Sequence, residues 1–212
     1  MKTEELIGTL VADHHRKPLV TGRTLCGAVP LALLVSACLF AWLLGARPDF
    51  GAALTSWRYL LKLLMAAAIA ATATACLLHL ARPQHRADSA FRWLPLLALP
   101  LLAGFVMEMA ALPSDRWLTA AIGNQPYFCL IFVPLLSLAP LAATLWALRQ
   151  GAPQSPGAGG AMAGLAAGGM GAVVFALHCD NDSPFYVAIW YLGAIGIVTL
   201  LGTFLGRRVL RW

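Results

Sequence analysis

Long apolar stretches alternate with short polar segments along most of this chain. Each stretch has about 20 residues, the length at which a helix crosses about 30 Å of hydrocarbon. They lack the alternation of a transmembrane barrel, and open strands cannot satisfy their backbone groups in lipid. The pattern therefore predicts an all-α fold, an integral membrane bundle of six transmembrane helices at residues 24–44, 59–80, 91–112, 127–148, 158–178 and 184–206.

Composition agrees with a chain that faces lipid rather than water. Only 11% of the residues are charged and 60% are hydrophobic, whereas a soluble domain has about 25% charged residues. The net charge of +6 comes from basic residues that lie between apolar runs, so we expect no direct binding of nucleic acid. The first 23 residues are polar and no cleavage site is obvious after them, so we expect no signal peptide.

The basic residues also predict the orientation in the membrane. Short cytoplasmic loops carry an excess of Lys and Arg. Eleven basic residues fall on one side of the six spans and three on the other, with Lys62 inside a span. The richer side holds Lys2, Arg16, Lys17, Arg23, Arg82, Arg86, Arg92, Arg149, Arg207, Arg208 and Arg211, and the poorer side holds Arg47, Arg58 and Arg116. Both termini are therefore predicted to be cytoplasmic.

This orientation divides the chain into a tail, a membrane domain and a short basic end. Residues 1–23 form a cytoplasmic tail, residues 24–206 form the transmembrane domain, and residues 207–212 form a basic cytoplasmic tail. The first tail predicts a short amphipathic helix whose apolar stripe is Leu6, Ile7, Leu10 and Val11. Such a helix is marginal alone in water, so it requires the membrane surface or a partner protein.

Two of the five cysteines fall at matching depths on the predicted outer face. Cys129 begins the fourth span, and Cys179 follows the outer end of the fifth, which is antiparallel to it. The extracytoplasmic side of a bacterium permits disulfides. Three interpretations of this pair remain open. The pair is a structural disulfide or two inert thiols, a reversible redox or metal sensor, or a catalytic thiol relay.

The residue before Cys179 adds a possible metal ligand. His178 can supply a nitrogen to a soft ion beside the two thiols, so Cys129, Cys179 and His178 are the candidate metal ligands. No CxxC pair or spaced Cys/His quartet exists, so no constitutive zinc site is expected. Asp180 and Asp182 are interpreted as residues of a solvated loop.

Two ionisable residues lie inside predicted spans. Lys62 and Glu108 each lie about one turn from the outer end of a span, and such residues are costly in lipid unless paired. Their equal depth suggests an ion pair, although Lys62 could instead extend alone to the interface.

The fifth span is unusually rich in glycine. Gly160, Gly164 and Gly168 recur every four residues and so share one helix face. Small residues at this spacing permit close approach of a second helix, so we expect this helix to pack tightly inside the bundle.

Several strings of residues, spread nearly from end to end, together carry a family resemblance. They are Glu5-Leu6-Ile7 with Leu10 and Asp13, Trp117, Gly123-Asn124, Cys129, the run Pro134 to Pro140, Gly151-Ala152-Pro153, His178-Cys179, Trp190-Tyr191 and Leu210-Arg211-Trp212. With these strings the chain resembles the NrsF-like membrane anti-sigma factors (negative regulator of sigma F).

The resemblance implies a regulator in the bacterial inner (plasma) membrane. Its partner would be an extracytoplasmic-function sigma factor, held at the cytoplasmic face by the stripe of Leu6, Ile7, Leu10 and Val11. Two outward cysteines that sense heavy metals or oxidants in the family correspond to Cys129 and Cys179. We therefore expect no enzyme and no constitutive cofactor, only a transient heavy-metal ion. A membrane thiol–disulfide oxidoreductase and a small metal transporter are the alternatives.

Overall fold

The computed structural model of the chain describes residues 21–80, 94–151, 153 and 155–210. Within these ranges every regular element is a helix. The α-helices are α2 (Thr21–Leu43), α3 (Phe50–Ala53), α4 (Trp57–Leu80), α6 (Ala98–Ala111), α7 (Trp117–Ile122), α8 (Tyr127–Arg149), α9 (Pro156–Ala176), α10 (Pro184–Tyr186) and α11 (Leu192–Val209). Two 3₁₀ turns precede α6 and α7, at Leu94–Leu97 and Ser114–Arg116, and a π-helical turn, Val187–Tyr191, joins α10 to α11.

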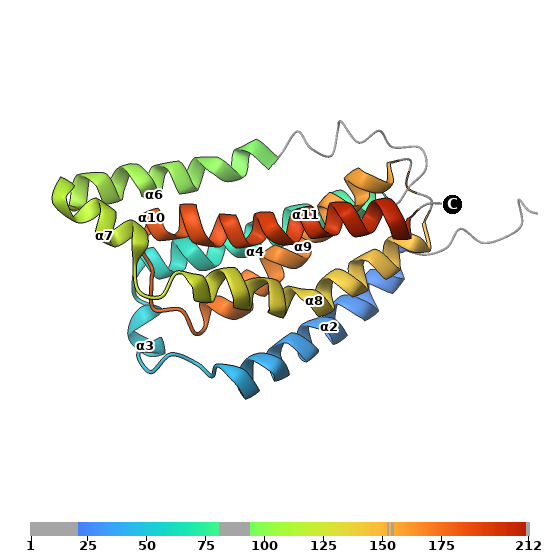
Figure 1. Cartoon of the computed structure of the whole chain (residues 1–212), viewed down its shortest axis with the longest axis horizontal. Coiled ribbons are helices and arrows are strands. Elements are labelled where there is room, and N and C mark those ends of the chain that lie inside the picture. Colours follow the sequence, from blue (N-terminus) through green and yellow to red (C-terminus); the bar gives the residue numbers. More distant parts are fainter. Residues whose placement is uncertain (1–20, 81–93, 152, 154, 211–212) are drawn as a thin grey trace, which may run out of the picture.

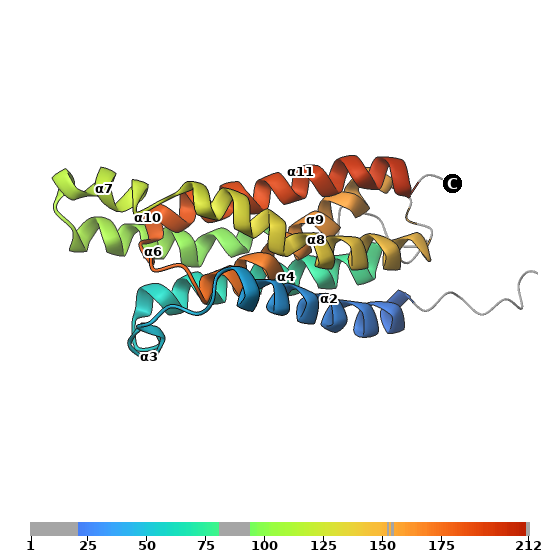
Figure 2. The ribbon, with the colours of Figure 1, turned by 60° about the horizontal axis from the view of Figure 1, so that its bottom comes forward.

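The long helices run roughly parallel to one axis of the molecule, with α9 in the middle (Figure 1). Helices α4, α8 and α11 all pack on α9, and α2 packs on α8 (Figure 2). Helix α6 lies at the edge of the bundle beside α4 and α10. The described start of α2 and the end of α11 lie at the same end of the bundle, opposite to α3, α7 and α10 (Figure 1).

The glycines of α9 allow α11 to approach closely, as the sequence predicted. A Cβ atom added at Gly164 would meet the carbonyl oxygen of Val198 at 2.5 Å, and one added at Gly202 would meet that of Gly160 at 2.5 Å. Of the residues in the most apolar stretch of α9, 72% are buried, against 22% for α2. The prediction of a tightly packed inner helix is therefore confirmed.

A proline in α8 leaves a backbone acceptor that α2 satisfies. Pro140 has no N–H to donate to the carbonyl of Leu136 one turn earlier. The hydroxyl of Ser36 on α2 donates to that oxygen at 2.7 Å, inside the bundle. A buried carbonyl that would otherwise lack a partner thus becomes a specific contact between the two helices.

Five of the described helical segments are long and apolar enough to cross a membrane, namely Thr24–Leu43, Trp57–Leu80, Tyr127–Arg149, Pro156–Ala176 and Pro184–Val209. The third predicted span contains the shorter apolar helix Pro95–Ala111, and the first residues of that predicted span lie outside the described part of the chain. The spans predicted at 24–44, 59–80, 127–148, 158–178 and 184–206 are thus confirmed as helices. The count of six and the cytoplasmic position of the termini stay predictions.

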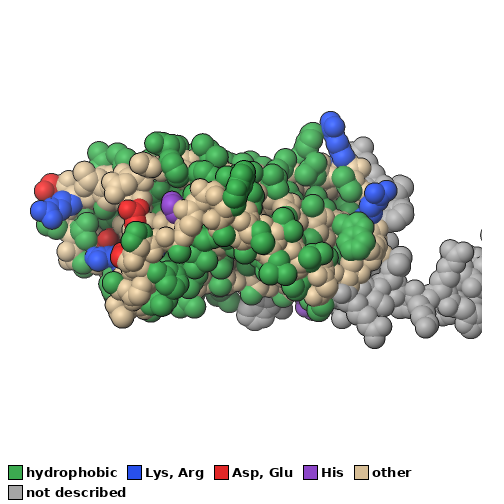
Figure 3. Space-filling view, turned by 90° about the horizontal axis from the view of Figure 1, so that it is seen from below, with side chains coloured by type: hydrophobic (Ala, Val, Ile, Leu, Met, Phe, Trp, Pro, Cys, Tyr) green, Lys and Arg blue, Asp and Glu red, His purple; other side chains and the backbone are tan. Residues whose placement is uncertain are grey.

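The surface of the bundle carries apolar side chains between two charged ends. Leu34, Leu64, Val106 and Leu200 are each more than 60% exposed, and Figure 3 shows hydrophobic side chains over the middle of the molecule with Lys, Arg, Asp and Glu near its ends. An apolar band of this kind is unfavourable in water and favourable in lipid. The five long helices therefore define a multi-pass membrane protein.

A buried cysteine site at one end of the bundle

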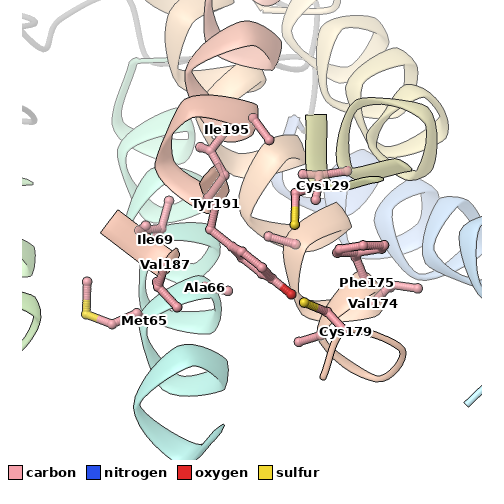
Figure 4. Close-up of a cluster of buried hydrophobic side chains, with 14 of the residues drawn as sticks. Met65, Ala66, Ile69, Cys129, Val174, Phe175, Cys179, Val187, Tyr191 and Ile195 are labelled. Atoms are coloured by element: carbon pink, nitrogen blue, oxygen red, sulfur yellow. The ribbon is translucent and has the colours of Figure 1, made fainter. Parts of the chain in front are cut away.

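Cys129 and Cys179 come together at the end of the bundle that carries α3, α7 and α10. Cys129 lies in the first turn of α8, and Cys179 lies just beyond α9. Both are buried free thiols, 0% and 5% exposed, and they lie close together in one cluster of buried side chains. Figure 4 shows both sulfur atoms inside the cluster of buried side chains. Antiparallel neighbouring helices thus bring residues 50 positions apart close together, at the depth expected from the sequence.

Two tyrosines of the last helical segment line the thiol pair. The hydroxyl of Tyr186 lies 3.0 Å from the Cys129 sulfur. The hydroxyl of Tyr191 lies beside the Cys179 sulfur (Figure 4) and has no nitrogen or oxygen partner among the described residues. A π-helical turn places residues five apart on one face. The turn Val187–Tyr191 therefore lets both hydroxyls reach the same small volume.

Residues 177–183, which join α9 to α10 and are here termed the cysteine loop, are held by the buried ammonium of Lys62. Its Nζ donates to the carbonyl oxygens of Cys179 at 2.8 Å and Asn181 at 3.2 Å, and to the carboxylate of Asp182. Lys62 is 1% exposed. A buried charge is tolerated when it is paired and fully hydrogen-bonded, and all three donors of this ammonium have an acceptor.

Arg47, from the segment between α2 and α3, holds the same loop from its other side. Its guanidinium donates to the carbonyl of Cys179 at 3.2 Å and to the carboxylates of Asp182 at 3.0 Å and Asp49 at 2.7 Å. The hydrogen bond from Arg47 lowers the pKa of Asp49, and the two carboxylates raise the pKa of Arg47. Asp182 is thus shared by two cations and is a structural residue of the loop. The interpretation of Asp182 as merely solvated is wrong.

The suggested pair of Lys62 and Glu108 is not formed. Glu108 accepts from Arg58 at 2.8 Å and from the hydroxyl of Ser183 at 3.3 Å, while Lys62 pairs with Asp182. The two charges have similar depth, but Lys62 bonds to residues 179, 181 and 182 of the cysteine loop while Glu108 bonds to Ser183 and Arg58. Depth along a span fixes one coordinate of a residue, and the helix face fixes the other.

His178 turns its Nδ1 to the carbonyl of Gly45, 3.0 Å away. Among the described residues, no three His, Cys, Asp or Glu side chains are grouped so that they could hold a metal ion. Cys129 and Cys179 remain as a two-thiol site, which suits a soft ion of low coordination number or a disulfide. The three-ligand set with His178 is not assembled in this structure.

The thiol of Cys179 has its pKa lowered. The neighbouring Cys129 thiol is the largest cause, and the charge of Lys62 acts in the same direction, while burial opposes both. A thiolate is the form that attacks oxidants and binds soft metals. The two cysteines are therefore unequal in their surroundings, although the sequence presents them as a matched pair.

A pocket of about 850 Å³ opens beside the cysteine loop. It is enclosed by three segments, at residues 46–49, 123–125 and 178–181, and by Phe128, Phe175 and Tyr186. Asn124 and Asn181 join two of these segments through reciprocal hydrogen bonds of 3.0 and 2.9 Å. Gly123 has a φ of 60°, and a side chain there would overlap the Tyr186 ring. Each segment is thus fixed by a specific residue.

Sequence reasoning missed several residues of this site. No recognisable motif contains Arg47, Asp182, Tyr186 or Tyr191. Of these four, only Tyr191 contributed to the family resemblance, in the string Trp190-Tyr191. The acidic residues of the Cys179–Asp182 segment could have been expected to pair with a cation, because a charge near the edge of the membrane is costly without a partner. The stripe of Leu6, Ile7, Leu10 and Val11 lies outside the described residues.

Five apolar helices with a buried thiol pair at one end define a multi-pass helical membrane protein with a cysteine site. Residues 10–212 match the profile of a family described as "Negative regulator of sigma F". The chain therefore belongs to this family, which consists of regulators and not of enzymes.

Two curated relatives cover the whole chain. It is 31% identical over 223 aligned positions to the "Probable anti-sigma-F factor NrsF" of Azospira oryzae, with all of both chains covered. It is 30% identical over 224 positions to the "Anti-sigma-F factor NrsF" of Caulobacter vibrioides, again with full coverage of both. No solved structure matches the chain.

Proposed function

We propose that the protein is an anti-sigma factor of the bacterial inner membrane that sequesters sigma F, a sigma factor of the extracytoplasmic-function class. Release would follow when Cys129 and Cys179 bind a heavy metal or are oxidised at the outer face. Family membership supports the regulatory role. The proximity of two buried thiols, at the end of the bundle remote from the described end of α11, is the observation that supports the sensing role.

The proposed switch requires a signal that binds two states of the protein differently. Two thiols meet this requirement, because a disulfide or a shared soft metal ion fixes their separation while free thiols do not. The cysteine loop links this event to α4 through Lys62 and, through Tyr191, to the π-helical turn that leads into α11. A change in the loop therefore has two helices through which it can reach the opposite end of the bundle.

The sensing role is tested by serine substitutions at the two cysteines. We expect Cys129→Ser and Cys179→Ser strains to repress a sigma F-dependent reporter as the wild type does, and to lose its induction by cadmium ion or hydrogen peroxide. Cys38→Ser is the matched control, because that thiol is exposed on the lipid-facing surface of α2. Induction equal to wild type in both outer variants would reject the sensing role.

The tail is the proposed contact for the sigma factor. Leu10→Glu would put a charge into its apolar stripe, and Thr9→Glu would put the same charge on the opposite face of the predicted helix. We expect Leu10→Glu to reduce the sigma factor that co-purifies with the full-length protein by about tenfold or more, because a buried leucine contributes about 2 kcal/mol. Equal losses in both variants would argue against a specific stripe.

A further inference from the structure

The two cysteines differ in their access to the pocket. Cys179 forms part of the pocket lining, together with His178, Asn181 and Phe128. Cys129 is not among the lining residues and is 0% exposed. Its sulfur lies against the hydroxyl of Tyr186, whose ring does line the pocket. Cys179 therefore borders the pocket, while Cys129 is covered.

The pocket has the size and chemistry of a small-molecule site. Its volume of about 850 Å³ lies within the range of roughly 300–1,000 Å³ that such sites occupy. Aromatic side chains of Phe128, Phe175 and Tyr186 form its apolar part, and Asn124 and Asn181 supply polar groups. The lining comes from loops and helix ends and not from the middle of a span, so the pocket opens at the end of the bundle that carries α3, α7 and α10.

We propose that this pocket is the port through which small thiol-reactive molecules reach Cys179, and that Cys129 reacts second, as the resolving thiol. The proposal rests on the sensing role given above and adds the route, the order of reaction and a size limit on the signal. Molecules that fit the pocket are hydroperoxides and small organic electrophiles. Large thiol reagents are excluded.

With a hydroperoxide the reaction balances in two steps. The Cys179 sulfur attacks the peroxide oxygen, the O–O bond breaks, and the products are a sulfenic acid at Cys179 and water or an alcohol. The Cys129 sulfur then attacks the Cys179 sulfur, an S–S bond forms, and water leaves. The two thiols lose two electrons and two protons in total, and the peroxide takes them up. Because the two thiols lie close together inside one cluster, the second step needs no opening of Cys129 to the pocket.

The order of reaction is measured on the purified full-length protein by brief labelling with N-ethylmaleimide and mass-spectrometric mapping of each cysteine. We expect Cys179 to be modified at least about tenfold faster than Cys129, since the rate follows access. A maleimide that carries a long polyethylene glycol chain should leave both unmodified while the protein is folded. Equal rates at the two cysteines, or faster labelling of Cys129, would overturn the proposal.

The route is tested by narrowing the port. Ala46 lines the pocket and is exposed, and Ala52 is exposed on α3 without lining it. We expect Ala46→Trp to slow the labelling of Cys179 several-fold and Ala52→Trp to leave it unchanged. Pro48→Trp, at another lining position, serves if Ala46→Trp does not fold. An unchanged Cys179 rate in a folded port variant would contradict the route.

Peroxide chemistry separates the two roles. In Cys129→Ser, hydrogen peroxide should give a sulfenic acid at Cys179 that dimedone traps, and in Cys179→Ser it should leave Cys129 as a free thiol. Dimedone trapping at Cys129 in the second variant would reverse the assigned order. These readouts do not involve the sigma factor. They can fail while the reporter response still depends on the cysteines, and they can succeed while that response does not.

Discussion

Lys62 is the residue on which the contacts of the cysteine loop converge. Its ammonium has no exposure to solvent and bonds to two backbone carbonyls and one carboxylate. It also lies 5.4 Å from the centre of the Tyr59 ring and 5.6 Å from that of Tyr191, where aromatic faces favour a cation. One side chain of α4 therefore fixes the loop that carries Cys179.

We expect Lys62→Met to destabilise the protein by about 3 kcal/mol, because removing one partner of a buried ion pair leaves polar groups unsatisfied. Arg47 still neutralises Asp182, so the loss falls mainly on the carbonyls of Cys179 and Asn181. The midpoint of thermal unfolding in detergent measures the effect. Arg116→Met, at an exposed arginine of the same end, should change stability by less than about 0.5 kcal/mol. Equal midpoints in the two variants would show that Lys62 is not a structural anchor.

The sequence predicts which residues of the site are unusual better than it predicts their partners. Hydropathy marks Lys62 and Glu108 as intramembrane charges, and depth brings Cys129 and Cys179 together. The acceptor for Lys62 belongs to a loop whose path depends on Asn124, Arg47 and the π-helical turn. Such contacts are set by tertiary structure, and no local pattern encodes them.

At the scale of helices, the contact between α9 and α11 is built on backbone rather than on large side chains. Gly160 and Gly164 on α9 face Gly202 and Val198 on α11. Association of helices in lipid relies on packing and not on the hydrophobic effect. The absence of side chains at these positions is what allows the two helices to pack over their length.

Gly164→Ala should therefore destabilise the bundle by about 1–3 kcal/mol, the usual cost of adding a methyl group where there is no room. Gly196→Ala is the matched control on α11, because a Cβ there meets nothing within 4 Å. Its helix loses a flexible residue, so we expect equal or slightly higher stability. The measurement is thermal unfolding of both variants in the same detergent. A stable Gly164→Ala protein would show that α11 can shift away from α9 at little cost.

The helices themselves were largely predictable, for a physical reason. A span must be apolar over its whole length to cross hydrocarbon, so the apolar runs locate α2, α4, α8, α9 and the segment Pro184–Val209 to within a few residues. The third span was less well defined. Pro95 and Pro100 interrupt the pattern of hydrogen bonds near its start, and the structure forms a 3₁₀ turn at Leu94–Leu97 before α6 begins.

At the scale of the whole molecule, the two ends of the bundle have different chemistry. The end with the cysteine site carries Arg47, Arg58 and Lys62, each paired with a carboxylate, and the exposed Arg116. The other end carries Arg207 and Arg208 in the last turn of α11 and Arg149 at the end of α8, without a salt bridge to them among the described residues. Over the whole sequence, eleven basic residues fall on the side of α11's end and three on the side of the cysteine site, and an excess of Lys and Arg favours the cytoplasmic side.

This asymmetry predicts the orientation, on which the outward position of the cysteines depends. A reporter inserted after Asp115, in the turn between α6 and α7, should be extracytoplasmic, and one fused to the C-terminus should be cytoplasmic. Alkaline phosphatase should therefore be active at the first position and inactive at the second, and a green fluorescent protein should show the reverse. Insertions that keep the downstream chain preserve all the basic loops, so the reporter does not itself set the topology. Phosphatase activity at the C-terminus would show that the cysteine site faces the cytoplasm, and it would exclude an extracytoplasmic signal.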